Sequence, residues 1–368
     1  MKSILFPGKF ILGKGTLASF GEYAKSLGKK FLVISSKSVM GKAQDKISKS
    51  FKDTDMVAEY IHFGGECSFS EINRLSAIGK EKGSDCVVGI GGGKLLDAAK
   101  AVAHDLKLPV IIIPTIASTD APTSALSVIY TDDGVFESYH WLPANPDVVL
   151  IDTEIICSAP VRYLVAGMGD AFATYYEARA VRDSGSKTCA VAALGRQTLS
   201  AFALAELCLK TLLDDGIKAL MAARVNAITP ALENVIEANI LLSGIGFESG
   251  GLAASHSIHN GLTVLPETHD AYHGEKVAFG VLTQLVLENA SFDEISSVMT
   301  FFVAAGLPVS LEEIGLLNVS EADLRKVADA ATVAGETIHN EPFEVTSDMV
   351  YSAMLTADTM GRSFLESM

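Results

Sequence analysis

The sequence has little positive charge and no cysteine pattern of a disulfide-bonded protein. It contains 29 lysine and arginine residues against 44 acidic ones, a formal net charge of −15. Such a negative protein repels phosphate, which argues against nucleic acid as the main partner. The five cysteines are odd in number, widely spaced and never form a Cys-x-x-Cys pair, which argues against a disulfide framework or a structural zinc knot. We expect most of them to be buried and reduced, as in a cytoplasmic protein.

Long apolar runs are also missing. The N-terminal apolar stretch stops at Pro7 and Gly8, which is too early for the core of a signal peptide. The longest stretch without a charged residue lies between Glu248 and Glu267, and its glycine, serine and histidine residues exclude a membrane helix. We find no clear repeat, low-complexity segment or linker. Since 49% of the 368 residues are hydrophobic, the chain can build a large core, and its length predicts about two domains.

The first half of the chain predicts a parallel β-sheet with helices on both faces. Short β-branched apolar runs alternate there with segments of helical spacing. The expected strands are 31–35, 57–62, 86–90, 110–113 and 148–151, and the expected helices between them are 42–51, 70–82 and 95–104. The sequence Asp132-Asp133-Gly134 lies between two further runs and predicts a hairpin of 126–131 with 135–139, in which the glycine adopts a positive φ.

After about residue 155 the pattern becomes helical. Long segments rich in alanine and leucine and nearly free of proline predict helices over 163–182, 188–213 and 217–243. Pro160 lies near a helix start, where its missing N–H costs little. We therefore predict an α/β dinucleotide-binding domain over 1–155 and an all-α domain over 156–368, with an enzyme site between them.

A glycine turn is the first candidate for a binding site. Gly91-Gly92-Gly93-Lys94 follows an expected strand and opens an expected helix. Free N–H groups at a helix N-terminus bind phosphate, and small residues let the phosphate approach the backbone. The run matches neither Gly-x-Gly-x-x-Gly nor the P-loop, and a tight turn without a ligand is the alternative. Asp97 either braces this turn or lies on an exposed helix face.

The loop after the fourth expected strand is rich in hydroxyl groups. It reads Pro114-Thr115-Ile116-Ala117-Ser118-Thr119-Asp120. Ligands of open parallel sheets lie beyond the carboxyl ends of the strands, so this loop is placed to bind phosphate or ribose oxygens. The alternative is a turn whose serine and threonine residues satisfy their own backbone.

A cluster of histidines suggests a metal site. Four of the eight histidines lie close together in the sequence: His256, His259, His269 and His273. His256 and His259 have the i, i+3 spacing that places two rings near one helix face. Asp170, in Gly167-Met168-Gly169-Asp170, introduces a carboxylate at an apolar helix start, where N-capping is the alternative. One aspartate and two histidines form a set that binds a catalytic divalent metal with an open position, although each histidine alone is better explained by packing or exposure.

Together these motifs resemble the glycerol dehydrogenases of the metal-dependent, iron-containing (group III) alcohol dehydrogenase superfamily. The resemblance extends over essentially the whole chain and implies a dehydroquinate synthase-like fold. It rests on 63–68 (FGGECS), 91–94 with Asp97 and Lys100, 114–115 with 118–120, 167–170 (GMGD), 256–261 (HSIHNG) and 273–278 (HGEKVA) followed by Gly280.

The resemblance also implies site residues and a reaction. It implies a zinc ion held by Asp170, His256 and His273, and glycerol or a related vicinal diol contacted by Asp120 and oxidised to dihydroxyacetone by hydride transfer to NAD. His259 is a candidate proton relay. The implied NAD site consists of Gly93, Lys94, Thr115, Ser118, Ser124, Leu126 and Tyr130, to which the glycine turn adds Gly91, Gly92 and Asp97 as candidates.

Two positions depart from the family pattern. Iron-using relatives typically carry a histidine four residues after the aspartate, and here that residue is Thr174, which favours zinc over iron or manganese. Members commonly have an acidic residue just after the first strand, where this chain has Lys37. A basic residue at such a place accommodates a 2′-phosphate, so we hypothesise that NADP is used as well as NAD. The alternative is a Lys37 side chain that points into solvent.

Two other functions stay open at this point. A glycerol-1-phosphate dehydrogenase-like enzyme would act on a phosphorylated substrate, whose binding requires arginine or lysine. The stretch 243–272 has neither, and Lys276 is the nearest following cation. A non-catalytic relative would bind metal or nucleotide without turnover. The resemblance implies a homo-oligomer, often an octamer, and we expect no nucleic acid and no membrane among the partners.

Overall fold

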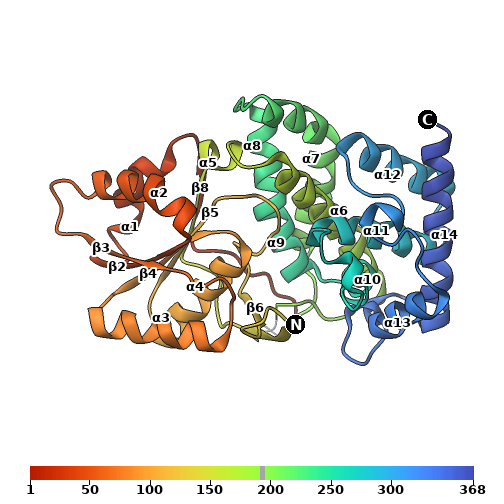
Figure 1. Ribbon diagram of the computed structural model, residues 1–368, viewed down its shortest axis with the longest axis horizontal. Helices are drawn as coiled ribbons and strands as arrows, with labels where there is room; N and C mark the ends of the chain where they lie inside the picture. Colours follow the sequence, from red (N-terminus) through yellow and green to blue (C-terminus); the bar gives the residue numbers. More distant parts are fainter. Residues whose placement is uncertain (191–194) are drawn as a thin grey trace.

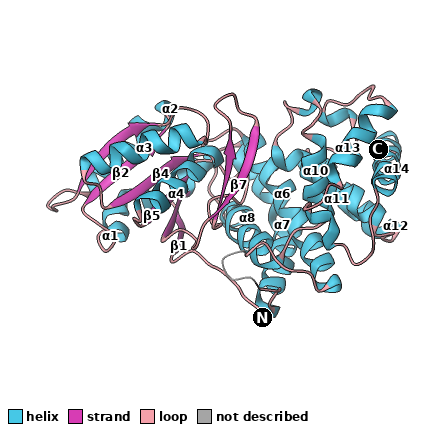
Figure 2. Ribbon diagram, turned by 90° about the horizontal axis from the view of Figure 1, so that it is seen from below, coloured by secondary structure: helices cyan, strands magenta, loops and turns pink. Residues whose placement is uncertain are grey.

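The computed structural model describes residues 1–190 and 195–368, except for the side chains of 37–40 and 42. An α/β part and a helical part lie side by side along the long axis of the molecule (Figure 1). The strands are confined to the first part and to a hairpin next to the helices (Figure 2). The predicted two-part fold is therefore confirmed.

The main sheet has six parallel strands in the order β1-β8-β5-β4-β2-β3. The bounds are β1 (Phe10–Gly13), β2 (Lys30–Ser35), β3 (Val57–His62), β4 (Cys86–Gly91), β5 (Val110–Pro114) and β8 (Val148–Asp152). The predicted strands lie within these bounds. Only β1 was not predicted, because its half-buried apolar run of Phe10, Ile11 and Leu12 is shorter than the about four residues expected of a buried strand.

Helices cover both faces of this sheet. Because side chains alternate along a strand, Phe31 and Val33 of β2 face the core beneath α1 (Phe20–Ala24) and α2 (Lys37–Ser50). Leu32 and Ile34 face the core beneath α3 (Phe69–Lys82) and α4 (Gly93–Leu106).

The predicted hairpin is confirmed. It pairs β6 (Leu126–Tyr130) with β7 (Phe136–Trp141) in antiparallel register, and Gly134 at its turn has a φ of 82°. Such a φ suits glycine because it has no Cβ.

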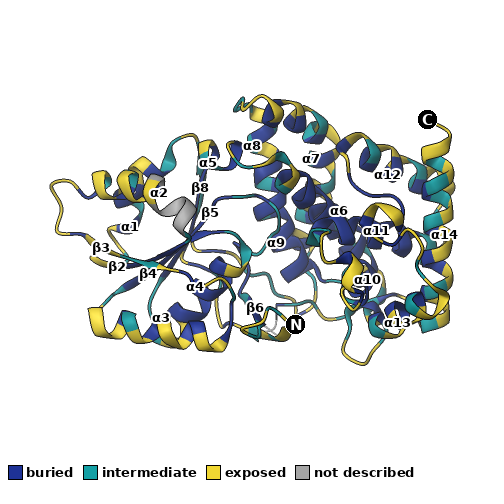
Figure 3. Cartoon of the chain, viewed as in Figure 1, coloured by how far each residue is buried: buried dark blue, intermediate teal, exposed yellow. Residues whose placement is uncertain are grey.

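The second part is built of helices around α6, whose inner residues are deeply buried (Figure 3). The α-helices are α5 (Thr153–Cys157), α6 (Val161–Ser184), α7 (Leu199–Arg224), α8 (Pro230–Glu237), α9 (Ser243–Ile245), α10 (Ala254–Leu262), α11 (His273–Leu287), α12 (Phe292–Ala305), α13 (Glu321–Ala331) and α14 (Ser347–Glu366). Two π-helical turns, η3 (Ala238–Leu242) and η4 (Gly246–Gly250), flank α9. Short 3-10 turns are η1 (Thr16–Ser19), η5 (Pro266–Thr268), η6 (Glu312–Ile314) and η7 (Thr337–Asn340).

Two predicted helices have wrong bounds. The helix predicted over 188–213 begins only at Leu199, where Thr198 accepts a hydrogen bond from the Ala201 N–H and caps it. The segment 217–243 is not one helix, because the chain turns after Arg224 and Asn226 adopts a left-handed φ of 53°. A new helix then starts at Pro230, which lacks the N–H that a continuous helix requires.

The N-terminal residues contact the helical part. The Arg196 N–H donates to the Met1 carbonyl at 2.9 Å, and the Leu5 N–H donates to Ser249 Oγ at 2.9 Å. These contacts cross the proposed boundary after residue 155, which stays a prediction. All five cysteines are free thiols. Among the helices of the described residues, none has the length and apolar character needed to cross a membrane.

Candidate active site

Glycines bring the candidate metal ligands together. Asp170 lies well inside α6 and not at its start, so N-capping does not explain it. A Cβ on Gly167 would lie 1.9 Å from the Ala117 carbonyl oxygen, and a Cβ on Gly169 would lie 2.3 Å from that of Gly274. The loop after β5 and the start of α11 therefore touch the backbone of α6 just before Asp170.

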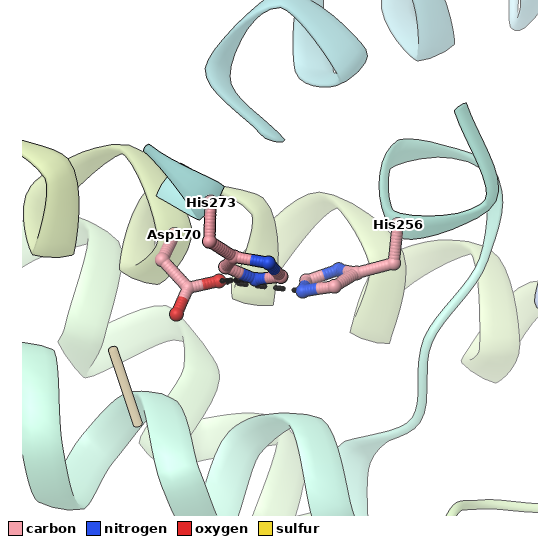
Figure 4. A group of neighbouring side chains, drawn as sticks. All are labelled: Asp170, His256 and His273. Atoms are coloured by element: carbon pink, nitrogen blue, oxygen red, sulfur yellow. Dashed lines mark hydrogen bonds and ion pairs between the residues drawn. The ribbon is translucent and has the colours of Figure 1, made fainter. Parts of the chain in front are cut away.

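Asp170, His256 and His273 converge at one point (Figure 4). The Nε2 atoms of His256 and His273 lie 3.3 and 3.1 Å from Asp170 Oδ1. Asp170 is 1% exposed, and its Oδ2 is a buried oxygen without a hydrogen-bond partner. Such an atom requires an explanation, and two imidazole nitrogens beside a carboxylate are the donor set of a divalent transition metal. These residues fit the implied metal.

Glu177 orients His256. Its buried carboxylate accepts hydrogen bonds from the backbone N–H groups of Ala253 (2.9 Å) and His256 (3.0 Å), and from His256 Nδ1 at 2.6 Å. The contact of Nδ1 with Glu177 leaves Nε2 as the ring nitrogen that faces Asp170. Burial alone would lower the pKa of His256, but the Glu177 and Asp170 carboxylates raise it well above its usual value.

His259 contacts the other candidate ligand histidine, His273. Its Nε2 lies 3.0 Å from His273 Nδ1, and its own Nδ1 lies 3.1 Å from Asn260 Oδ1. Burial and repulsion from His273 hold the pKa of His259 well below its usual value. These contacts place His259 behind His273. Its role as a proton relay stays a prediction.

Asp120 lies near the ligand group. Its Oδ2 accepts a hydrogen bond from Ser243 Oγ at 2.8 Å, and Ser243 Oγ lies 3.0 Å from Thr174 Oγ1. Burial, followed by repulsion from the Asp170 carboxylate, raises the pKa of Asp120. Thr174 lies one helical turn beyond Asp170 on α6, and its hydroxyl is thus paired with that of Ser243.

The glycine turn lies where β4 ends and α4 begins. Gly91 ends the strand, Gly92 is the extended N-cap, and Gly93 is the first helical residue. The Thr115 N–H donates to the Gly91 carbonyl at 3.0 Å, which joins this turn to the hydroxyl-rich loop. Ser118, further along that loop, is half-buried.

Lys94 borders the same turn. Its ammonium lies 2.6 Å from a carboxylate oxygen of Glu66 and 4.7 Å from the ring centre of Tyr130. Gly91, Gly92, Gly93, Lys94, Thr115 and Tyr130, all candidates for cofactor binding, therefore border one turn. The side chain of Lys37, another candidate, lies outside the described residues.

A buried ion pair holds the segment that leads into the hairpin. Lys100 Nζ lies 2.9 Å from Asp97 Oδ1 and donates to the carbonyls of Ala121 (2.8 Å), Ser124 (3.2 Å) and Leu126. The Asp97 Oδ2 accepts from the backbone N–H of β6 residue Val128 at 3.0 Å. The side-chain contacts of Asp97 therefore brace the hairpin, while Ser124 and Leu126 are held through their carbonyls.

This chain is similar to known proteins over nearly its full length. Residues 7–153 match the model of a family described as iron-containing alcohol dehydrogenase. A glycerol dehydrogenase of Escherichia coli is 54% identical and is aligned over 98% of this chain and 97% of its own length. The chain belongs to the iron-containing alcohol dehydrogenase family. A solved structure of glycerol dehydrogenase from Schizosaccharomyces pombe, 36% identical, superposes with a TM-score of 0.95 over 100% of this chain and 93% of its own. A probable glycerol dehydrogenase from Sinorhizobium meliloti, 42% identical, gives 0.92 over 99% of both chains.

These matches confirm the resemblance of this family member to glycerol dehydrogenases.

Two residues of the candidate site, Glu177 and Ser243, were not predicted from the sequence. Glu177 lies seven residues after Asp170, which is two turns along the same face of α6, so the spacing was a usable signal. Ser243 gave no signal, because its contact with Asp120 joins residues 123 positions apart.

Proposed function

We propose that this chain oxidises glycerol, or a related vicinal diol, to dihydroxyacetone and transfers a hydride to NAD. The observation that carries the proposal is the convergence of Asp170, His256 and His273. The contact with Glu177 orients the ring of His256 so that Nε2 faces this group. Asp120 lies beside this group, and several relatives with at least 50% identity over nearly the full chain are named glycerol dehydrogenase.

Asp170 Oδ1 and the Nε2 atoms of His256 and His273 would hold a divalent metal. When bound, the metal supplies Lewis acidity that lowers the pKa of an alcohol. We propose zinc, because three protein ligands with an open position are typical of catalytic zinc and Thr174 offers a hydroxyl already paired with Ser243.

The remaining steps belong to residues of the chain. The Asp120 carboxylate accepts a hydrogen bond from a substrate hydroxyl and so fixes the orientation of the carbon to be oxidised. His259 holds the ring of His273 through its 3.0 Å contact. At the glycine turn, the N–H groups of the α4 N-terminus and the Lys94 ammonium would hold the cofactor phosphates. The cofactor would supply the hydride acceptor.

The choice between NAD and NADP depends on Lys37 in this proposal. A lysine after the first β-α strand accommodates the 2′-phosphate of NADP. Initial rates with the two cofactors at matched concentrations test this part. A strong preference for NAD in the protein and an unchanged preference in Lys37→Ala would reject it.

A coupled assay tests the proposed function. The protein is stripped with a chelator, zinc, iron(II) or manganese is returned, and reduced cofactor is followed with glycerol and NAD. Activity that disappears with the metal and returns with zinc supports the proposal. Asp170→Asn should lose metal affinity and turnover together, and full activity with full metal content in that variant would refute the ligand assignment.

Assays of ketone reduction and of cofactor and metal binding separate the two alternatives. A phosphorylated substrate needs a free cation, yet Lys276 donates to the Thr268 carbonyl and Arg162 pairs with Glu275. Reduction of dihydroxyacetone in preference to dihydroxyacetone phosphate supports the polyol. Binding of both NAD and zinc without turnover of any alcohol would favour a non-catalytic relative.

We further propose a cytoplasmic homo-oligomer, with an octamer as the form to test. The free cysteines suit a reducing compartment. Along α7 and just beyond its end, large apolar side chains such as Leu199, Leu213 and Val225 are more than half exposed, as on a surface between subunits. Sedimentation velocity measures the assembly, and a monomer at assay concentrations would refute it.

A further inference from the structure

The segment between α8 and α10 departs from regular helix twice. The π-helical turns η3 and η4 flank Ser243–Ile245, so Ser243 lies at the end of the first turn. Such turns are rare and are often found at functional sites. Every residue of this segment from Ser243 to Gly250 is buried, so the distortion is held by packing within the core.

Three side chains from distant parts of the chain meet at Ser243. Its hydroxyl donates to Asp120 Oδ2 at 2.8 Å and lies 3.0 Å from the Thr174 hydroxyl. A serine hydroxyl carries a single proton, and that of Ser243 is donated to Asp120. The Thr174 hydroxyl must then donate to Ser243 Oγ. The hydrogen bonds therefore run in one direction, from Thr174 through Ser243 to Asp120.

Two glycines fix Ser243 between its partners. A Cβ on Gly244 would lie 1.8 Å from Thr123 Oγ1, and a Cβ on Gly246 would lie 2.1 Å from Thr174 Cγ2. Larger residues would therefore push the segment away from the loop that carries Asp120 or from α6. Both glycines are required for the close contact in which Ser243 lies.

The first π-helical turn also binds the Asp120 loop. Thr123 Oγ1 donates to the Ile240 carbonyl at 3.0 Å, and Asn239 Nδ2 donates to the carbonyls of Ala117 (3.0 Å) and Leu164 (3.1 Å). The loop 117–123 is thereby joined to α6, the helix that carries Asp170. The position of Asp120 relative to Asp170 is set by this segment.

We propose that Ser243 is a positioning residue that holds one oxygen of the Asp120 carboxylate and leaves the other to accept a hydroxyl of the polyol. The inference rests on the proposed contact between Asp120 and substrate. Without Ser243 the carboxylate can rotate about its own side-chain bonds, and the substrate hydroxyl loses a fixed acceptor. Errors of about 1 Å in such placement cost up to about 100-fold in rate.

The first test is Ser243→Ala in the zinc-loaded enzyme. We expect kcat/KM for glycerol to fall about 10- to 100-fold, while zinc content and the Kd for NADH stay unchanged, because Ser243 contacts neither site. Ser310→Ala is the matched control, since Ser310 is also a buried serine that donates to a carboxylate, at 3.0 Å from Glu313. This control should keep the wild-type kcat/KM.

A double-mutant cycle separates positioning from general damage. If Ser243 acts through Asp120, Ser243→Ala lowers kcat/KM in the wild type but adds no further loss to Asp120→Asn. Equal losses in both backgrounds would overturn the inference, as would wild-type kcat/KM in Ser243→Ala. If Asp120→Asn alone keeps full activity, the proposed role of Asp120 fails instead.

Ser243→Cys covers the case in which the alanine variant does not fold. Its side chain nearly keeps the volume of serine but offers only a weak S–H donor. We expect an intermediate kcat/KM with unchanged zinc content. A cysteine variant with wild-type kcat/KM would overturn the inference.

Discussion

Removal of the Glu177 charge should weaken the metal site without removing any ligand. The Glu177 carboxylate accepts three hydrogen bonds, two from backbone N–H groups and one from His256 Nδ1. In Glu177→Gln the amide oxygen keeps the two backbone bonds, which share Oε1. The amide NH₂ then faces the Nδ1–H of His256, so two donors oppose each other.

His256 relieves this conflict by moving its proton to Nε2. That nitrogen is the proposed ligand atom, and in the new tautomer its lone pair is occupied. Loss of a partner that orients a metal-bound histidine costs about 10- to 100-fold in metal affinity, or about 1.4 to 2.7 kcal/mol. We expect a loss in this range for zinc, because the carboxylate contact is 2.6 Å and the histidine side chain is only 14% exposed.

The assay is competition between the metal-free protein and a chromophoric zinc chelator at fixed pH. Glu248→Gln is the matched control: its carboxylate is 1% exposed and accepts a backbone hydrogen bond from Ala125 at 2.9 Å, but it touches no proposed ligand. The control should bind zinc as the wild type does. A folded Glu177→Gln protein with wild-type zinc affinity would refute the reasoning.

Three further predictions concern charged groups outside the ligand set. Glu66→Gln should tighten NADH binding by up to about fivefold, because the variant frees Lys94 to bind phosphate and a part-exposed ion pair is worth about 0–1 kcal/mol. Fluorescence titration measures the Kd for NADH, and a weaker Kd in the variant would contradict this prediction. Lys100→Met should cost about 3–5 kcal/mol in urea unfolding because Asp97 is left buried and unpaired, and a loss below about 1 kcal/mol would disprove this. Burial raises the pKa of Glu341 to about 8, so the folded metal-free protein keeps a proton that the unfolded chain releases above pH 4.5. Stability should therefore fall between about pH 4.5 and 8, and Glu341→Gln should flatten this dependence in urea unfolding at pH 6, 7 and 8, whereas an identical slope would count against it.

The sheet could be predicted because its signals are local. A strand buried on both faces needs a continuous apolar run, and the runs of β2, β4, β5 and β8 are such segments. The predicted ends of a helix were wrong where composition favoured a helix and a local signal such as proline opposed it. Alanine and leucine continue up to Arg224, yet the chain turns before Pro230. The proline was the better signal, because it stops a helix whatever the neighbouring residues favour.

The site depends on contacts that no local pattern contains. His256 and His273 lie 86 and 103 positions after Asp170, so their spacing alone predicts no convergence. Their selection as a set came from the family resemblance. The partners of these residues show the same limit. Glu177 lies on the same helix face as Asp170, so its spacing could have predicted the contact, whereas no spacing predicts the contact of Ser243 with Asp120.

Glycines in the sequence indicate where these distant contacts form. Gly167 and Gly169 admit the loop after β5 and the start of α11 to the backbone of α6, and a Cβ on Gly274 would lie 1.7 Å from the Ala166 carbonyl oxygen. Gly244 and Gly246, just after Ser243, admit Thr123 of the Asp120 loop and Thr174 of α6 in the same way. A glycine inside a helix costs about 1 kcal/mol relative to alanine, so several of them beside charged or hydroxyl residues indicate close backbone contact. The motif around Asp170 is therefore best interpreted as a mark of tertiary contact at a proposed ligand, and not as the start of a helix.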